Sequence, residues 1–555
     1  MKSLYISALA CLFFTSSLYS QTGFIESVGY GNNLDEMIWA SASDADGNMY
    51  LTGAFSSTSL TLGTITLTNS GSGTSDAFIA KFDATGTIAW AHSYGTANAD
   101  EARQVVPDDS GNVYFSGYFN AASITIGGFT LTNNGDDDIF IAKADESGTI
   151  IWAKGIGSLN DNRPEGFMLD PSNNLVLTGG FTNAPITIGT TIHTNAGNSD
   201  FFVVRVNSSN GSTYFSQAFG GSGQDDAQGL SISAASGYIY VGGRFSSPTL
   251  VLGTTTLTNS NAGTNEAFVM EINNSDVVSW AERFGGSADE QVNGLLTPTG
   301  GANTLFVSGD FSGNTVVIGN DTLTNAGSGN ADGFLISITN HIVNWAISVG
   351  GTGEDVGFGL ATRAPMDDIF MTGVFNSPSI TIGSNTLMNS GTGTFDIYVA
   401  SFDKTSGTPT WEGKAGNTEN DFAFGLQCRL NSTSLYLTGW FAGPSITFGS
   451  LPIITSAGGN DGFLAEISLI TGMNELEREY NFLIYPNPSS GVFTIENSEG
   501  SALMVHVYNS NGELTYSMRS TAYKQQIDLT NQQPGLYLYT IQTEHGLQTG
   551  KIVKR

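Results

Sequence analysis

Short runs of alternating apolar and polar residues fill the chain from residue 22 to about residue 470. Residues 100 to 157 contain four of them, ARQVV, NVYFSGYF, DIFIAKA and TIIWAKGIG, separated by turns rich in Asp, Ser and Gly. Alternation with a period of two between such turns predicts four antiparallel strands. A shorter ribbon, SITIGGFTLTN, lies between the second and third runs. No stretch of this body has an apolar period near 3.6, so we expect an all-β fold.

The same unit recurs along the body. The phrases GNMYLTGAF and GNVYFSGYF share a glycine that reappears, with drift around it, at Gly53, Gly117, Gly179, Gly243, Gly309, Gly373 and Gly439. A second glycine follows each of these at Gly63, Gly127, Gly189, Gly253, Gly319, Gly383 and Gly449. Four-stranded sheets repeated at a fixed period are typical of propellers, so residues 22–470 are predicted to form a seven-bladed β-propeller.

The last unit lacks one strand. Six units end in a strand centred on an aromatic residue, namely Trp90, Trp152, Phe215, Trp280, Trp345 and Trp411. The seventh stops after DGFLAEISL, whereas FIESVG at Phe24 to Gly29 is similar to WAISVG at Trp345 to Gly350. We therefore expect the N-terminal segment to complete the last sheet, because an unpaired edge is a liability that propellers avoid. The aromatic residues are interpreted as buried packing residues.

The two ends of the chain have different patterns. Lys2 and the apolar run from Leu4 to Leu18 predict a secretory signal peptide over residues 1–20, with a lipid anchor at Cys11 as the alternative. If Cys11 is removed, Cys428 is the only cysteine left, so no intramolecular disulfide is expected. The apolar run is too short to span a membrane stably, so no transmembrane segment is expected in the mature chain. Residues 471–480 are predicted to be a linker. Residues 481–555 contain short alternating runs that predict a small C-terminal β-sandwich.

Several phrases resemble known families. YPNPSSGVFTI, VHVYNSNGEL, PGLYLYTI and the terminal KIVKR resemble the type A C-terminal sorting domain of the type IX (Por) secretion system. This resemblance implies a Bacteroidota-type bacterium, the type IX secretion machinery as a partner, passage through the periplasm, and an extracellular or cell-surface, outer-membrane-attached location. The body resembles SBBP propeller repeats through D-x-x-G-N-x-Y-x-T-G-x-F and W-A-x-x-x-G. That resemblance implies a fold but no particular chemistry.

The charge excludes one class of partner. The chain has 19 Lys and Arg against 50 Asp and Glu, a net charge of −31, and the tail from residue 481 is balanced. The body is therefore strongly acidic and lacks a basic cluster, which excludes nucleic acid as a partner.

Two acids recur in every unit. One stands before the innermost strand and the other at the start of the third strand, and both are expected on one face. Short carboxylates accept backbone N–H bonds at turns, which gives a structural interpretation, whereas several carboxylates on one face could also bind calcium as a cofactor. The candidates are Asp35, Asp100, Asp161, Asp225, Asp289, Asp355 and Asp421, and then Asp76, Asp138, Asp200, Glu266, Asp332, Asp396 and Asp461.

No catalytic set is evident in the body. His92, His193 and His341 occupy unrelated positions in their units, so neither a metal cluster nor a Ser/His/Asp set is indicated. The sequence predicts a non-catalytic binding or structural module whose ribbon-bearing face contacts a glycan, matrix or protein ligand. A carbohydrate-active enzyme using two carboxylates, either a glycosidase or a lyase, is the alternative, and a simple surface-coat role is a third possibility.

Overall fold

The computed structural model describes residues 23–71, 73–299, 303–327, 329–362, 368–428, 434–468, 482–497, 503–509, 514–520, 522–543 and 546–555. These residues form strands and turns, and no helix occurs among them. The chain divides into two compact units, Met1–Ile470 and Thr471–Arg555, which are treated separately below. The predicted signal peptide and the predicted linker at 471–480 lie outside the described residues.

Seven sheets of the first unit share one order of four antiparallel strands, from an innermost strand to a fourth, outer strand, and in the sixth sheet two further strands extend this order to six. They are numbered sheet 1 to sheet 7 along the chain. The innermost strands are β2 (Glu36–Ser43), β8 (Asp100–Pro107), β14 (Asn162–Leu169), β20 (Asp225–Ile232), β26 (Glu290–Leu296), β32 (Asp355–Thr362) and β38 (Asp421–Cys428). The second strands are β3 (Met49–Phe55), β9 (Val113–Phe119), β15 (Leu175–Thr182), β21 (Ile239–Phe245), β27 (Thr304–Phe311), β33 (Asp368–Phe375) and β39 (Ser434–Phe441).

The remaining strands complete these sheets. The third strands are β6 (Asp76–Phe82), β12 (Asp138–Ala144), β18 (Ser199–Val206), β24 (Glu266–Ile272), β30 (Asp332–Thr339), β36 (Asp396–Asp403) and β42 (Asp461–Ser468). The fourth strands are β7 (Ile88–Tyr94), β13 (Ile150–Ile156), β19 (Thr213–Phe219), β25 (Val278–Phe284), β31 (Ile342–Val349), β37 (Pro409–Gly416) and, in sheet 7, β1 (Gly23–Tyr30).

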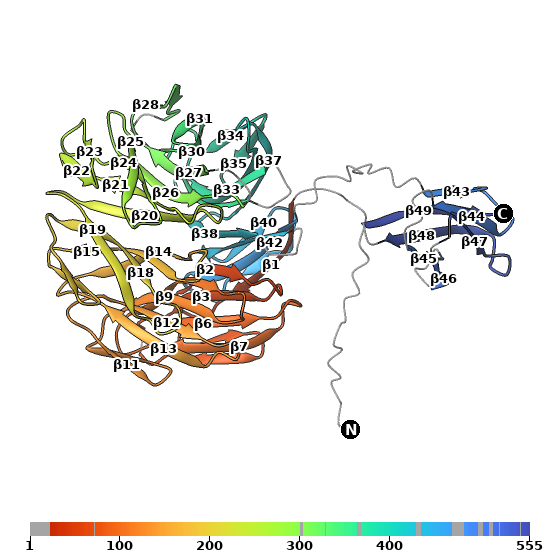
Figure 1. Ribbon diagram of the computed structural model, residues 1–555, viewed down its shortest axis with the longest axis horizontal. Helices are drawn as coiled ribbons and strands as arrows, with labels where there is room; N and C mark the ends of the chain where they lie inside the picture. Colours follow the sequence, from red (N-terminus) through yellow and green to blue (C-terminus); the bar gives the residue numbers. More distant parts are fainter. Residues whose placement is uncertain are drawn as a thin grey trace. The chain divides into compact units, whose positions relative to one another are not determined.

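The innermost strands form a closed ring. Each of them contacts the innermost strand of the next sheet, and β38 contacts β2, so the last sheet returns to the first. Figure 1 shows the sheets around a common centre, with β2, β14, β20 and β38 near the middle. This arrangement is a β-propeller, as the alternating runs predicted.

The N-terminal strand closes the ring. β1 pairs antiparallel with β42, which confirms that the N-terminal segment supplies the missing strand. The predicted residue match is wrong by two positions, because Glu26 faces Glu466 as Trp345 faces Ser337 in sheet 5. Phe24 packs edge-on against Trp411, with ring centroids 6.5 Å apart, and also contacts Phe448.

Both recurrent glycines have a steric reason. A Cβ added to Gly117 would lie 1.9 Å from the carbonyl oxygen of Glu101, so no side chain fits between the first two strands. Gly127 has a φ of +55° at the turn of the ribbon and lies against Ile150, a conformation that favours glycine. The other units have the same two features, which explains the fixed spacing of the two glycines.

Seven two-stranded ribbons follow the second strands. They are β4 (Ser59–Leu62) with β5 (Ile65–Thr68), β10 (Ser123–Ile126) with β11 (Phe129–Thr132), β16 (Ile186–Ile188) with β17 (Thr191–His193), β22 (Thr249–Leu252) with β23 (Thr255–Thr258), β28 (Thr315–Ile318) with β29 (Asp321–Thr324), β34 (Ser379–Ile382) with β35 (Asn385–Met388), and β40 (Ser445–Phe448) with β41 (Ile454–Thr455). Ribbon strands such as β11, β22 and β28 lie toward the outer edge of the ring in Figure 1.

The ribbons cover the outer strands of neighbouring sheets. β10 contacts β7 and β16 contacts β13, while β40 pairs directly with β37. Each such contact covers an edge that would otherwise have free N–H and C=O groups. The recurrent ribbon asparagine is also used internally, since Asn133 Nδ2 donates to the carbonyl oxygen of Phe119 at 3.1 Å. The ribbons therefore serve the framework.

The aromatic residues of the fourth strands link neighbouring sheets. Trp90 Nε1 donates to the carbonyl oxygen of Glu146 at 2.9 Å, and Trp152 Nε1 donates to that of Ser208 at 3.1 Å. Trp90, Trp152 and Trp345 are buried, as expected, whereas Phe215, Trp280 and Trp411 are only half-buried. Each donor reaches a turn of the following sheet, which supports a structural role.

The second unit contains two antiparallel sheets. One consists of β43 (Phe482–Tyr485), β44 (Val492–Asn497) and β47 (Lys524–Asp528). The other consists of β46 (Leu514–Ser520), β45 (Leu503–Tyr508), β48 (Gly535–Thr543) and β49 (Gly546–Lys554). Phe493 and Ile527 of the first sheet share one buried cluster with Val505, Ile541 and Ile552 of the second. The two sheets thus have a common core.

Candidate functional site

The acids of the third strands are buried turn residues. All seven have an exposed fraction of 2% or less, and each accepts a backbone N–H from the preceding loop, as Asp76 does from Ser70 at 2.7 Å. A glycine makes room for the carboxylate, since a Cβ on Gly157 would lie 2.0 Å from Cγ of Asp138. This geometry favours the structural interpretation of Asp76, Asp138, Asp200, Glu266, Asp332, Asp396 and Asp461.

The acids of the innermost strands fall into two groups. Asp100, Asp225, Asp355 and Asp421 are the first residues of their strands and are fully buried. Asp35, Asp161 and Asp289 stand one residue earlier and are exposed. The buried position in those three sheets is held by Glu36, Asn162 and Glu290. The sequence grouping is therefore out of register by one residue in sheets 1, 3 and 5.

Buried acids from adjacent sheets lie near each other. Burial, and then the neighbouring Asp76, raise the pKa of Asp100 to about 7. Asp76 Oδ1 and Asp100 Oδ1 are both buried without a hydrogen-bond partner. At one interface an amide replaces an acid, and Asn162 Nδ2 lies 3.4 Å from Asp138 Oδ1. We call these residues the interface pairs, namely Asp461 with Glu36, Asp76 with Asp100, Asp138 with Asn162, Asp200 with Asp225, Glu266 with Glu290, Asp332 with Asp355, and Asp396 with Asp421.

The interface pairs are too small to form a metal cluster by themselves. Among the described residues, no group of three or more His, Cys, Asp or Glu is placed to hold a metal ion. The loop from Asp44 to Asn48, which carries two acids, is a hairpin turn in which Asp44 accepts from the backbone N–H groups of Asp46 and Asn48. Calcium binding by the predicted acids therefore stays a prediction.

A different set of residues surrounds the axis. Each innermost strand has a β-bulge at which one or two residues lose their partner on the second strand. A bulge re-aims a side chain, and these side chains line a single pocket of about 380 Å³. We call them the axial ring. They are Trp39, Arg103, Glu165, Gln228, Asn293, Phe358 and Phe424.

A second set of residues begins two positions before each axial-ring residue on the same strand. It pairs the second residue of each innermost strand with the penultimate or nearby residue of the second strand. We call these the mouth pairs, namely Met37 with Ala54, Glu101 with Tyr118, Arg163 with Gly180, Asp226 with Arg244, Gln291 with Asp310, Val356 with Val374, and Phe422 with Trp440. Unlike the framework residues, both sets differ from sheet to sheet.

One side of the axis is aromatic. Phe424 lies 5.4 Å, between ring centroids, from both Trp39 and Phe358. Phe422 stacks on Phe424 at 5.9 Å and on Trp440 at 4.9 Å. These rings are half-exposed and come from sheets 1, 6 and 7, so they form one continuous apolar wall.

The other side is polar and hydrogen-bonded. The Arg103 guanidinium lies 3.8 Å from the Trp39 ring centroid, and its Nε lies 3.0 Å from Glu101 Oε2. In sheets 4 and 5, Arg244 contacts Asp226 Oδ2 and donates to Gln291 Oε1, both at 3.2 Å. The Arg and acid residues thus meet as pairs across sheets 2 to 5.

Two carboxyl groups near the axis have raised pKa values. Enclosure by the ring raises the pKa of Glu165 to about 7, although channel solvent reaches its side chain. Burial raises the pKa of Asp310 to about 6, while donors on Gln291 and Asn293 act in the opposite direction. Both groups can therefore exchange a proton under mild conditions.

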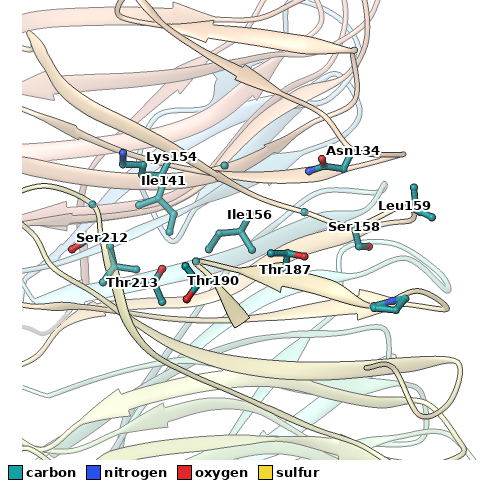
Figure 2. A pocket seen from close by; sticks show the side chains of 16 residues that line it. Asn134, Ile141, Lys154, Ile156, Ser158, Leu159, Thr187, Thr190, Ser212 and Thr213 are labelled. Carbon is teal, nitrogen blue, oxygen red and sulfur yellow. The ribbon is translucent and has the colours of Figure 1, made fainter. Parts of the chain in front are cut away.

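A larger cavity lies away from the axis. A groove of about 790 Å³ runs between sheets 2 and 3, where Ile156, Thr187 and Thr213 line it in Figure 2. A Cβ added to Gly155 at this groove would meet no atom closer than 3.9 Å, so the missing side chain opens the space. Arg283 and Lys414 fill the corresponding position in sheets 4 and 6 and pair with buried acids.

Sequence reasoning missed the axial residues because it searched for what the units share. A usable signal was nonetheless present. After the acid, or in sheet 3 the asparagine, that starts each innermost strand come one variable residue, one small, branched or proline residue, and then the ring residue, which is followed by glycine in five units. A position that takes six residue types in seven copies, while the flanking positions hold mostly small residues, indicates a site free from the constraints of packing.

Known proteins match the tail most specifically. Residues 483–555 match the family described as a secretion system C-terminal sorting domain. This match confirms the resemblance of the tail and marks the chain as a β-propeller protein for type IX export to the cell surface or extracellular space. No described helix is long and apolar enough to cross a membrane.

Matches to the body are distant. A curated uncharacterized WD repeat-containing protein L264 from Acanthamoeba polyphaga mimivirus is 27% identical over 158 residues. That match covers 26% of this chain and spans only 11% of the length of the viral protein.

Solved structures of low similarity were also found. The Pan2 WD40 domain of Neurospora crassa is 11% identical, with a TM-score of 0.34, over 66% of this chain and 89% of its own. The quinohemoprotein alcohol dehydrogenase of Comamonas testosteroni is 10% identical, with a TM-score of 0.36, over 85% of this chain and 80% of its own. The phage phi92 endosialidase is 8% identical, with a TM-score of 0.33, over 96% of this chain and 87% of its own. The fold assignment rests on the sheet topology described above.

Proposed function

We propose that this chain is a seven-bladed, SBBP-type propeller that acts outside the cell as a non-catalytic binding module, and that its ligand occupies the axial pocket. The supporting observation is the convergence of the axial ring and the mouth pairs, which are the positions that differ between sheets. Packing requires the framework to repeat, but it does not require six residue types at seven equivalent positions around one axis. A pocket that joins an apolar wall to a few polar groups is typical of ligand sites.

The proposed function has a direct test. The purified protein is screened against arrays of polysaccharides and of matrix and surface proteins, and both retention and product release are recorded. We expect retention without products, and we expect substitutions in the axial ring to weaken it. Retention that no axial substitution affects would place the ligand elsewhere, and the absence of any retention would favour the coat role.

The enzyme alternative also has a specific supporting observation. Glu165 has a pKa of about 7 and faces the axial pocket, which suits a general acid. A Glu165→Gln variant separates the two functions. If the protein is a glycosidase or lyase, this variant should lose product release by a factor of about a hundred or more while keeping retention.

A further inference from the structure

We infer that the axial pocket binds the uncharged end of a glycan chain, with the following sugars leaving along an aromatic path over sheets 6 and 7. This inference rests on the proposed function and adds the ligand class and the direction of binding. It depends on three properties of the pocket, which are its size, the order of its aromatic rings and its charge.

The size of the pocket favours a chain end over a continuous chain. The volume of about 380 Å³ lies at the lower end of the range for small-ligand sites, about 300–1,000 Å³. Strands from all seven sheets line it, so its walls surround the ligand on every side. A terminal sugar or a short oligosaccharide fits such a site, whereas a polysaccharide lying across the face would contact only its rim.

The aromatic rings form a path that leads away from the axis. Phe424 belongs to the axial ring, Phe422 stacks on it, and Phe395 lies 5.3 Å from Phe422 between ring centroids. Trp440 stacks on Phe422 as well. The half-exposed rings give a succession of apolar faces against which the C–H faces of consecutive sugars can pack. Isolated core aromatics would not be arranged in such a series.

The charge of the lining favours an uncharged sugar. Each arginine that reaches the axis in the described residues has a carboxylate partner. Arg103 pairs with Glu101, Arg163 with Asp137 at 2.6 Å, and Arg244 with Asp226. Sulfate or uronate groups would need arginines or lysines free to bind them. The Gln228 amide and the amide oxygen of Asn293 instead offer the neutral hydrogen-bonding groups that sugar hydroxyls require. The amide nitrogen of Asn293 donates within the protein, to Asp310 and to the carbonyl oxygen of Gly357.

The internal repeat supplies variants that the fold already tolerates. Trp440→Ala gives sheet 7 the residue that sheet 1 has at the same position, which is Ala54. Phe424→Gln gives it the axial residue of sheet 4, which is Gln228. Trp280→Ala is the matched control. Trp280 lies on β25, the outer strand of sheet 4, where it is half-buried and stacks on His341 of sheet 5.

The experiment measures binding of the purified full chain to neutral gluco-, galacto-, manno- and xylo-oligosaccharides of two to six units and to their parent polymers. Partial hydrolysis of a bound polymer should raise its binding capacity in proportion to the new chain ends, and the matching oligosaccharide should compete. Trp440→Ala and Phe424→Gln should each weaken binding by at least about tenfold, and Trp280→Ala should leave it unchanged.

Other results would overturn the inference in distinguishable ways. Retention that is insensitive to chain ends and to oligosaccharides would disprove end recognition, and salt-sensitive retention of sulfated or uronate polymers alone would disprove the uncharged class. In both cases an axial-variant effect would still support the proposed function. If binding persists unchanged in both Trp440→Ala and Phe424→Gln, the inference and the proposed site both fail. Binding of a protein but no glycan would overturn the ligand class.

Discussion

The interfaces between sheets and the axis of the ring obey opposite rules. At the interfaces, the same buried acid, the same glycine and the same ribbon recur in each unit. At the axis, the bulges present aromatic, cationic, anionic and amide side chains from successive sheets. Repetition satisfies the packing of like sheets, and variation at one place indicates selection for something that packing does not need. The difference separates framework from site without any comparison of homologues.

The largest expected effect comes from opening the ring. Deleting Gly23 to Tyr30 removes β1 and exposes the edge of β42. The loss of the half-buried Phe24 side chain alone should cost about 1–2 kcal/mol of unfolding free energy, and the exposed edge should promote association. Thermal unfolding and size-exclusion chromatography measure both effects. The control is a variant that lacks residues 1–21 and keeps β1. If the variant without Gly23 to Tyr30 melts at the same temperature as this control, closure by β1 is disproved.

The next effect tests the glycine beside a buried interface acid. Gly157→Ala places a methyl group about 2.0 Å from Cγ of Asp138, and such overpacking should cost about 1–3 kcal/mol. Gly155→Ala, two residues earlier in the same sheet, meets nothing closer than 3.9 Å and should change stability by less than about 0.5 kcal/mol. Urea unfolding of both variants gives the comparison. Equal losses would mean that the carboxylate does not lie on Gly157.

A smaller effect tests the charge of an interface pair. Burial raises the folded-state pKa of Asp100 to about 7 from an ordinary value of about 3.9. The stability that the folded state gains by holding this proton is therefore complete below about pH 4 and is lost as the pH rises through 7. Asp100→Asn copies the natural amide at Asn162. At pH 8 it should raise the unfolding free energy by about 1 kcal/mol, which is measured as a higher melting temperature. Asn162→Asp should do the reverse.

The same two variants test calcium. If calcium joins the interface pairs, adding it should stabilise the unaltered protein, a chelator should reverse the effect, and Asp100→Asn should lower stability in calcium. An unmoved transition removes calcium from the account. Melting curves at pH 5 and pH 8, with and without calcium, distinguish a proton from a metal ion.

The smallest effect on stability is expected at the axis. Phe424→Gln replaces a half-exposed ring by the residue that sheet 4 carries there, so the unfolding free energy should change by less than about 1 kcal/mol. A loss comparable to that of Gly157→Ala would show that the axial ring is framework after all, and it would remove the contrast from which the site was inferred. Differential scanning calorimetry measures both variants under one condition.

The sequence predicted the features that repetition makes visible. The glycine spacing, the four runs per unit and the missing last strand led to the propeller and to the pairing of β1 with β42. The register was harder. The likeness of FIESVG to WAISVG places Phe24 at the tryptophan position, whereas the strand pairing puts Glu26 there. The bulge beside Phe24 also occurs beside Trp345, so like phrases, rather than a difference in strand geometry, account for the mismatch. Similarly, two adjacent acids, Asp35 and Glu36, stand at the start of β2, and only the pairing of Glu36 with Phe55 places Glu36 at the buried position.

The candidate site could not be predicted in the same way. Trp39 and Glu165 belong to different units and share no motif, so only the closed ring brings them into one pocket. The bulges decide which side chain turns toward the axis, and a bulge is a detail of pairing rather than of composition. The apolar wall likewise depends on sheets 6, 7 and 1 being neighbours.

The pairing of β1 with β42 also sets an order of events. The strand nearest the start of the chain is completed only by residues that are made about 440 positions later. During synthesis, the ring must remain an open arc until Ser468 has emerged, and the first strand must wait unpaired. Such distant partners make closure a slow, late step, so the closed form reports that the whole body has been made.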